Sequence, residues 1–144
     1  SDISKEALRV AKINYNQHKY LIHKDSEIEF IFSDRMKEFD KKFDLILTNP
    51  PYIKKSESKK YVHQQVQKFE PKLALYIQDD QYIQWFKQLL FEIFNSLKTN
   101  GHFIMEGSEF HLETLLDIAN ELGFKQLEII MDYSENQRFL IGKK

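Results

Sequence analysis

The residues with the clearest chemical potential are Asn49 to Tyr52, which read Asn-Pro-Pro-Tyr directly after the apolar run FDLIL. Proline lacks a backbone N–H and fixes φ, so two prolines end a strand and stiffen the loop that follows. Ligands of open α/β sheets bind beyond such strand ends. The Asn49 side-chain oxygen and the Pro50 carbonyl are acceptors of fixed direction, and the Tyr52 ring can stack on a planar group or lie near a cation.

Two acceptors held in this way can bind both hydrogens of a planar –NH2 group. The nitrogen of an amide or exocyclic amine is a poor nucleophile because its lone pair is delocalised. Holding both hydrogens favours a pyramidal nitrogen with a localised lone pair, which stabilises the transition state for attack on a sulfonium methyl group. The alternative is that Asn49–Pro51 are only a turn after a strand, and the buried-strand pattern before them favours the functional interpretation.

The predicted elements around this corner alternate in type. Ser4 is a plausible N-cap for the first helix, and Gly101 a plausible residue to follow the helix over 80–98. In chain order we expect a helix from Ser4 and strands over 28–34 and 41–49, the second of them buried on both faces. A loop with one short helix is expected over 53–78, followed by a helix over 80–98 that ends at 99–101. The rest of the chain is expected to form a strand over 102–106, a helix over 110–123 closed by Gly123, and strands over 124–134 and 137–143. The alternation predicts an α/β sheet with helices on both faces and a C-terminal antiparallel hairpin.

The composition narrows the class of protein. The 144 residues suffice for one domain with a real core, and a formal net charge of −1 gives no electrostatic footprint for nucleic acid. The absence of cysteine excludes disulfides and thiolate metal sites, and the five histidines lack metal-ligand spacing. No apolar run reaches a membrane span, and the N-terminus lacks a signal-peptide core. We therefore expect a soluble, cytoplasmic protein with no metal and no membrane partner.

The chain resembles a known family in several stretches. FDLILTNPPYI resembles motif IV of class I S-adenosylmethionine (SAM)-dependent methyltransferases that modify planar –NH2 nitrogens. Residues 1–17, the FSD of 32–34, the KFEPKLAL of 68–75 and the closing 132–144 resemble, in order, segments of the HemK/PrmC family, the glutamine-N5 methyltransferases of peptide release factors. The last two stretches are the specific ones, because Asn-Pro-Pro-Tyr is shared with other methyltransferases.

The resemblance implies a role for individual residues. The implied catalytic residues are Asn49, Pro50, Pro51 and Tyr52: Asn49 and Pro50 would hold the glutamine amide of the Gly-Gly-Gln loop of a release factor, and Tyr52 would wall the pocket. The implied SAM-binding residues are Asp2 for the ribose hydroxyls, Asp34 and Arg35 beside the adenine, and Asn49. A helix N-terminal charge is the structural alternative for Asp2. Arg35 departs from the aromatic residue that is common at its position in the family, and Glu70 with Pro71 is expected to shape the loop.

The glycines also depart from the family pattern. The family's Gly-rich SAM loop precedes the position of Asp2, whereas the first glycine here is Gly101. We therefore expect residues 1–144 to be a single partial catalytic domain without the N-terminal helical domain and first strand, and to be inactive in isolation. A strand edge at 43–48 would then be exposed.

Three alternatives remain open at this point. The substrate could be adenine in nucleic acid or a glutamine of a ribosomal protein, or the chain could be a non-enzymatic remnant. Lys54, Lys55, Lys59 and Lys60 flank the expected pocket mouth and could steer an acidic partner, although a solvated loop is the preferred interpretation.

Overall fold

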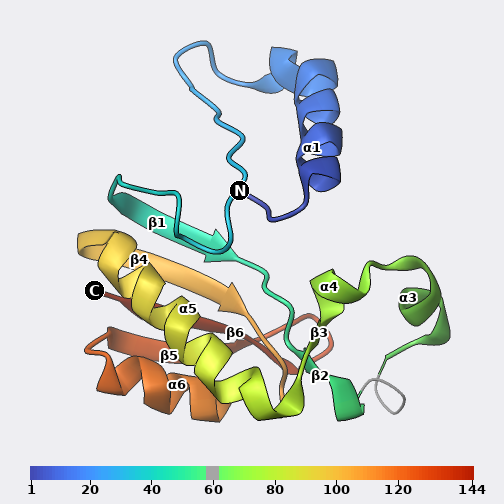
Figure 1. The fold of residues 1–144 in the computed structure, drawn as a ribbon. Helices are drawn as coiled ribbons and strands as arrows, with labels where there is room; N and C mark the ends of the chain where they lie inside the picture. Colours follow the sequence, from blue (N-terminus) through green and yellow to red (C-terminus); the bar gives the residue numbers. More distant parts are fainter. Residues whose placement is uncertain (58–61) are drawn as a thin grey trace. The chain divides into compact units, whose positions relative to one another are not determined.

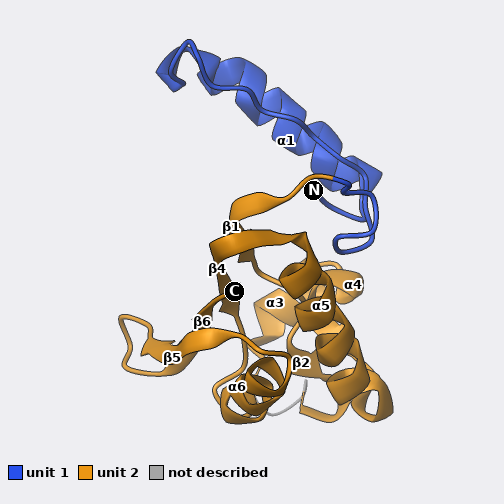
Figure 2. Ribbon diagram, turned by 90° about the vertical axis from the view of Figure 1, so that its left-hand side faces the viewer, with its two compact units in different colours: residues 1–40 blue, residues 41–144 orange. Residues whose placement is uncertain are grey.

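The computed structural model describes residues 1–57 and 62–144, so Lys59 and Lys60 lie outside the described residues. The chain forms two compact units, residues 1–40 and residues 41–144, which are coloured separately in Figure 2. No helix within the described ranges is both long and apolar enough to cross a membrane.

Unit 1 contains the first helix and one extended segment. Helix α1 spans Lys5–His18, and the Ser4 hydroxyl accepts a hydrogen bond from the Ala7 backbone N–H, which confirms the predicted N-cap. The 3₁₀ helix η1 (Lys19–Leu21) follows it. The expectation of a regular strand over 28–34 was wrong, because this segment makes only one isolated parallel bridge within unit 1, between Phe32 and Asp2. Apolar and other residues alternate over 28–34 as they do in a strand, but within unit 1 this segment finds a strand-pairing partner only in Asp2, so no continuous strand pairing develops.

Unit 2 is built on a four-stranded sheet of order β1-β4-β6-β5, comprising β1 (Phe43–Thr48), β4 (Leu97–Glu106), β6 (Gln137–Lys143) and β5 (Lys125–Met131). Strands β1 and β4 are parallel, and β6 is antiparallel to both of its neighbours. This arrangement confirms the predicted C-terminal hairpin at one edge. Strand β1 occupies the opposite edge, as its order in the sheet requires.

Helices α5 (Tyr82–Ser96) and α6 (Leu112–Glu121) pack side by side over one face of this sheet (Figure 1). Gly123 follows α6 with φ of 100°, which confirms it as the left-handed residue that closes the helix. The buried side chains between helices and sheet form the core, and include Tyr82, Phe86, Leu89, Leu90, Ile93, Phe103, Met105, Leu112, Leu115, Ala119 and Leu140.

Two expectations about the strands were wrong. Strand β1 is not buried on both faces, because Leu45 is 50% and Leu47 is 66% exposed while Ile46 faces the helices. Residues 99–101 do not end a helix: β4 begins at Leu97, directly after α5. Gly101 is needed instead for close packing, since a Cβ there would lie 2.9 Å from the carbonyl oxygen of Phe43.

The segment after β1 contains more structure than expected. Its elements are β2 (Ile53–Lys54), η2 (Lys55–Glu57), α3 (Gln64–Phe69), α4 (Lys72–Leu75), β3 (Tyr76–Ile77) and η3 (Asp79–Gln81). Strands β2 and β3 pair in parallel. Glu70 and Pro71 lie between α3 and α4, where they cap the two helices.

Candidate active site

The Asn49–Tyr52 corner lies at the carboxyl end of β1, where the chain leaves the sheet for the segment that carries β2 (Figure 1). Thr48 is in register with Met105 of the parallel strand β4, so Asn49 and Glu106 lie at the same end of the sheet, the carboxyl end of both strands. Asn49 is exposed, Pro50 is buried and Tyr52 is partly buried. A buried proline beside an exposed amide matches a stiff loop that presents the Asn49 side chain outward.

Tyr52 is held at three points. Its hydroxyl donates to Oε1 of Glu106 at 2.9 Å, and its backbone carbonyl accepts from the hydroxyl of Tyr82 at 3.1 Å. The guanidinium carbon of Arg138 lies 5.8 Å from the centre of the Tyr52 ring, within cation–π range. The corner is thus connected to β4, to the start of α5 and to β6.

Burial, together with the hydrogen bond to Glu106, raises the pKa of the Tyr52 hydroxyl, and Arg138 opposes that rise. Burial raises the pKa of Tyr82 further, with Glu57 adding to the effect. Both hydroxyls therefore remain protonated at neutral pH and keep their roles as hydrogen-bond donors.

The segment after the corner is also connected to the helical layer. Nε2 of His111, just before α6, lies 2.8 Å from Oε1 of Glu57 in η2. The ammonium of Lys54 lies 5.0 Å from the centre of the Tyr82 ring. Lys54 thus contacts the helical layer through its ammonium, and a steering role for it stays a prediction.

Unit 1 holds the residues expected to bind a cofactor. The backbone N–H of Asp2 donates to Ile31 and its carbonyl accepts from Ser33, which brings Asp2 beside the extended segment that ends at Asp34. Oδ1 of Asp2 accepts the backbone N–H of Ser4 at 2.7 Å. Asp2 thus also serves the start of α1, as in the structural alternative.

Asp34 and Arg35 occupy a turn fixed by a buried serine. The hydroxyl of Ser33, 3% exposed, donates to the carbonyl of Arg35 at 2.9 Å. Arg35 has φ of 56°, and its guanidinium lies 3.7 Å from the carboxylate of Asp34, which also binds Lys37. Ser33 was missed from the sequence, although a serine before Asp at a strand end is a recognisable turn signal.

The predicted site residues fall into two sets, one within each unit. Asp2 and the Asp34–Arg35 turn are neighbours in unit 1, and Asn49 to Tyr52 form the corner in unit 2. Glu106, Tyr82 and Arg138 are partners that the sequence did not reveal. The one signal was Arg138 itself, an arginine directly before the apolar run Phe139 to Ile141 of β6.

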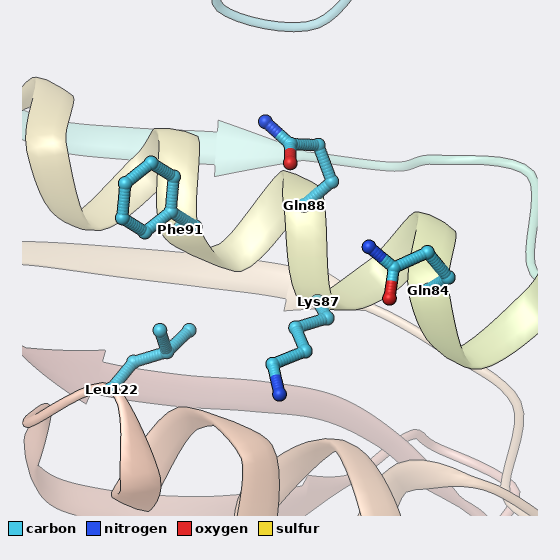
Figure 3. Close-up of a pocket in the computed structure, with 5 residues that line it drawn as sticks. All are labelled: Gln84, Lys87, Gln88, Phe91 and Leu122. Carbon is cyan, nitrogen blue, oxygen red and sulfur yellow. The ribbon is translucent and has the colours of Figure 1, made fainter.

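A hollow of about 410 Å³ lies elsewhere, on the helical layer between α5 and the end of α6 (Figure 3). Its lining is Gln84, Lys87, Gln88, Phe91 and Leu122. This lining brings one cation and two amides without a nucleophile or carboxylate, so the hollow offers no counterpart to the chemistry of the Asn49–Tyr52 corner.

The fold of this chain is similar to that of a known methyltransferase. A solved methyltransferase from Pyrococcus furiosus superposes with a TM-score of 0.64 at 18% identity, over 98% of this chain and 59% of that one. The sequence profile of the methyltransferase small domain family matches residues 1–74, which include the Asn49–Tyr52 corner. The chain belongs to the methyltransferase small domain family.

Relatives with curated names are similar over nearly the whole chain. A release factor glutamine methyltransferase of Leptospira interrogans is 34% identical over 98% of this chain and 48% of its own length. The protein of the same name from Borreliella burgdorferi is 31% identical over 98% of this chain and 47% of its own length. The chain thus spans about half the length of these relatives.

Proposed function

We propose that the protein containing this chain transfers a methyl group from SAM to the side-chain amide nitrogen of a glutamine in the Gly-Gly-Gln loop of peptide release factors. The observation that carries the proposal is the Asn49–Tyr52 corner at the carboxyl end of β1 in a chain of the methyltransferase small domain family. The names of the similar relatives support the choice of substrate.

The carboxylates of unit 1 suit the polar parts of SAM. Oδ1 of Asp2 is bonded to Ser4, which leaves Oδ2 as an acceptor for a ribose hydroxyl, the partner that carboxylates bind in dinucleotide folds. Asp34 and Arg35 supply an acceptor and a planar cation beside it, suited to the edge and face of an adenine. When bound, SAM supplies an electrophilic methyl group on a sulfonium.

We assign all 144 residues to one partial catalytic domain.

The corner orients and activates the amide in this proposal. The Asn49 side-chain oxygen and the Pro50 carbonyl accept the two amide hydrogens, and their grip favours a nitrogen lone pair aimed at the methyl carbon. SAM held by Asp2, Asp34 and Arg35 would supply its methyl group to this nitrogen and leave as S-adenosylhomocysteine, and the nitrogen would release one proton. That proton can leave to water because Asn49 is exposed. Tyr52 forms the wall that keeps the amide plane in place.

The test is a substrate comparison with the full-length gene product and isotopically labelled SAM. A release factor, a ribosomal protein and an adenine-containing oligonucleotide are offered in parallel, and the modified residue is mapped by mass spectrometry. We expect one methyl group on the glutamine of the Gly-Gly-Gln loop. Labelling of adenine or of the ribosomal protein alone would overturn the substrate, and no labelling at all would overturn the enzymatic role.

A further inference from the structure

Arg138 of β6 connects the C-terminal hairpin to the Asn49–Tyr52 corner. Nε of Arg138 lies 3.2 Å from Oδ2 of Asp132, and Nη1 donates to the carbonyl of Gly107 at 3.4 Å. The Gly107 backbone N–H in turn donates to the carbonyl of Arg138 at 2.9 Å. A planar guanidinium can serve several acceptors at once, so these contacts fix its plane as well as its charge. The guanidinium carbon of Arg138, Cζ, lies 5.8 Å from the Tyr52 ring centre.

Asp132 is itself immobilised by the turn between β5 and β6. Its Oδ1 accepts the backbone N–H groups of Ser134 at 2.8 Å and Asn136 at 3.1 Å. These bonds, that from Asn136 foremost, and the Arg138 guanidinium lower the pKa of the Asp132 carboxyl. The carboxylate therefore stays charged at neutral pH, and through it the hairpin turn holds the Arg138 guanidinium in place.

Two hydrogen bonds also hold Tyr52, but both leave its ring able to rotate. The bonds to Glu106 and Tyr82 hold the hydroxyl and the backbone carbonyl, which are the two ends of the residue. The hydroxyl oxygen lies on the axis of the Cβ–Cγ bond, so neither hydrogen bond sets the rotation of the ring plane about that axis. The cation over the ring face supplies that third constraint.

We propose that Arg138 is a positioning residue, which sets the plane of the Tyr52 ring and through it the wall against which the substrate amide is oriented. The proposal rests on the proposed function for its substrate. A misplaced wall leaves the binding of SAM intact but spoils the approach of the nitrogen to the methyl group. Misplacement by about 1 Å can lower a rate roughly hundredfold.

The kinetic test uses the full-length gene product with release factor as substrate. We expect Arg138→Met to lower kcat at least about tenfold with little change in the KM for SAM, and Arg138→Lys to recover part of the loss. In a Tyr52→Leu background, Arg138→Met should change kcat by no more than about twofold, because the wall it positions is gone. The matched control is Lys98→Met, which breaks the exposed pair of Lys98 with Asp44 in the same sheet and should leave kcat unchanged.

The opposite outcomes are clear. An unchanged kcat in Arg138→Met, or an equal loss with and without the Tyr52 ring, would show that Arg138 does not act through Tyr52. If the wild-type protein transfers no methyl group, the proposed function fails, and a second readout decides the role of Arg138.

That readout is the NMR signal of the ¹³Cζ-labelled tyrosines in the 144-residue chain, with Tyr52 assigned by its loss in Tyr52→Phe. Removal of the cation in Arg138→Met should shift the Tyr52 signal and leave that of Tyr20, which is 76% exposed in unit 1, in place. A Tyr52 signal that stays unchanged in Arg138→Met would overturn the positioning itself. The same spectra report whether each variant is folded.

Discussion

Replacing Tyr82 by phenylalanine removes the hydroxyl that anchors the candidate corner from the helical side. Tyr82 is 0% exposed, and its hydroxyl donates to the backbone carbonyl of Tyr52 at 3.1 Å. The phenylalanine ring keeps the contacts with Phe86 and His111, whose ring centres lie 4.9 Å and 4.8 Å away. The substitution therefore deletes one hydrogen bond and creates almost no cavity.

The size of the effect follows from the acceptor that is left behind. Loss of a partly buried hydrogen bond whose acceptor stays unsatisfied lowers the free energy of unfolding by about 1–2 kcal/mol. For a unit the size of residues 41–144, this corresponds to roughly 4–8 °C in the melting temperature. The control is Tyr133→Phe, which removes a hydroxyl from a fully exposed side chain and should change stability by less than about 0.5 kcal/mol.

The assay is urea unfolding of the 144-residue chain followed by the fluorescence of Trp85. This residue is the only tryptophan, and it lies on α5 three positions after Tyr82. We expect a lower midpoint for Tyr82→Phe at an unchanged slope. Equal midpoints for Tyr82→Phe and Tyr133→Phe would refute the anchoring of the corner by this hydroxyl.

Three further substitutions test the packing, the hairpin turn and the cofactor residues. Gly142→Ala should lower the free energy of unfolding by about 1–3 kcal/mol, because the added Cβ would lie 2.6 Å from Cε1 of the buried Phe103, and an unchanged urea midpoint would contradict that packing. The pKa of Asp132 is lowered, chiefly by the backbone N–H of Asn136, so its stabilisation is present above its unfolded pKa and is lost as pH falls through the folded value. The melting temperatures of wild type and Asp132→Asn should therefore converge below about pH 4, and a constant gap down to pH 2 would exclude this origin. Asp2→Asn keeps the Oδ1 acceptor for the helix start but removes the charge, and should weaken calorimetric binding of SAM and of S-adenosylhomocysteine by roughly tenfold or more; equal affinities for Asp2→Asn and wild type would exclude this contact with the ribose.

Features fixed by local chemistry were predictable from the sequence. Ser4 caps α1 because its side chain reaches an N–H three residues on, and Gly123 closes α6 because it adopts positive φ without strain. The strand that leads into Asn49 was predictable from its apolar run and the prolines after it. The terminal hairpin followed from two strand patterns joined by a short turn.

Features that depend on distant partners were not predictable in this way. Residues 99–101 look like a helix stop, but Gly101 is required by the approach of Phe43 from another strand. Leu45 and Leu47 are exposed because they lie on the sheet face opposite to the buried Ile46, and the apolar run alone cannot reveal which face is covered. The bond between Tyr52 and Glu106 joins residues 54 positions apart, and the residues of this site lay hidden for the same reason.

The most direct test of the central claim is the rate of methyl transfer to the release-factor glutamine by the full-length gene product, with and without the Asn49→Ala substitution. Asn49 is exposed at the end of β1, so its truncation removes an acceptor without opening the core. We expect a rate at least about a hundredfold lower, with a much smaller loss of SAM affinity. An Asn49→Ala enzyme that methylates the glutamine at the wild-type rate would contradict the role assigned to the corner.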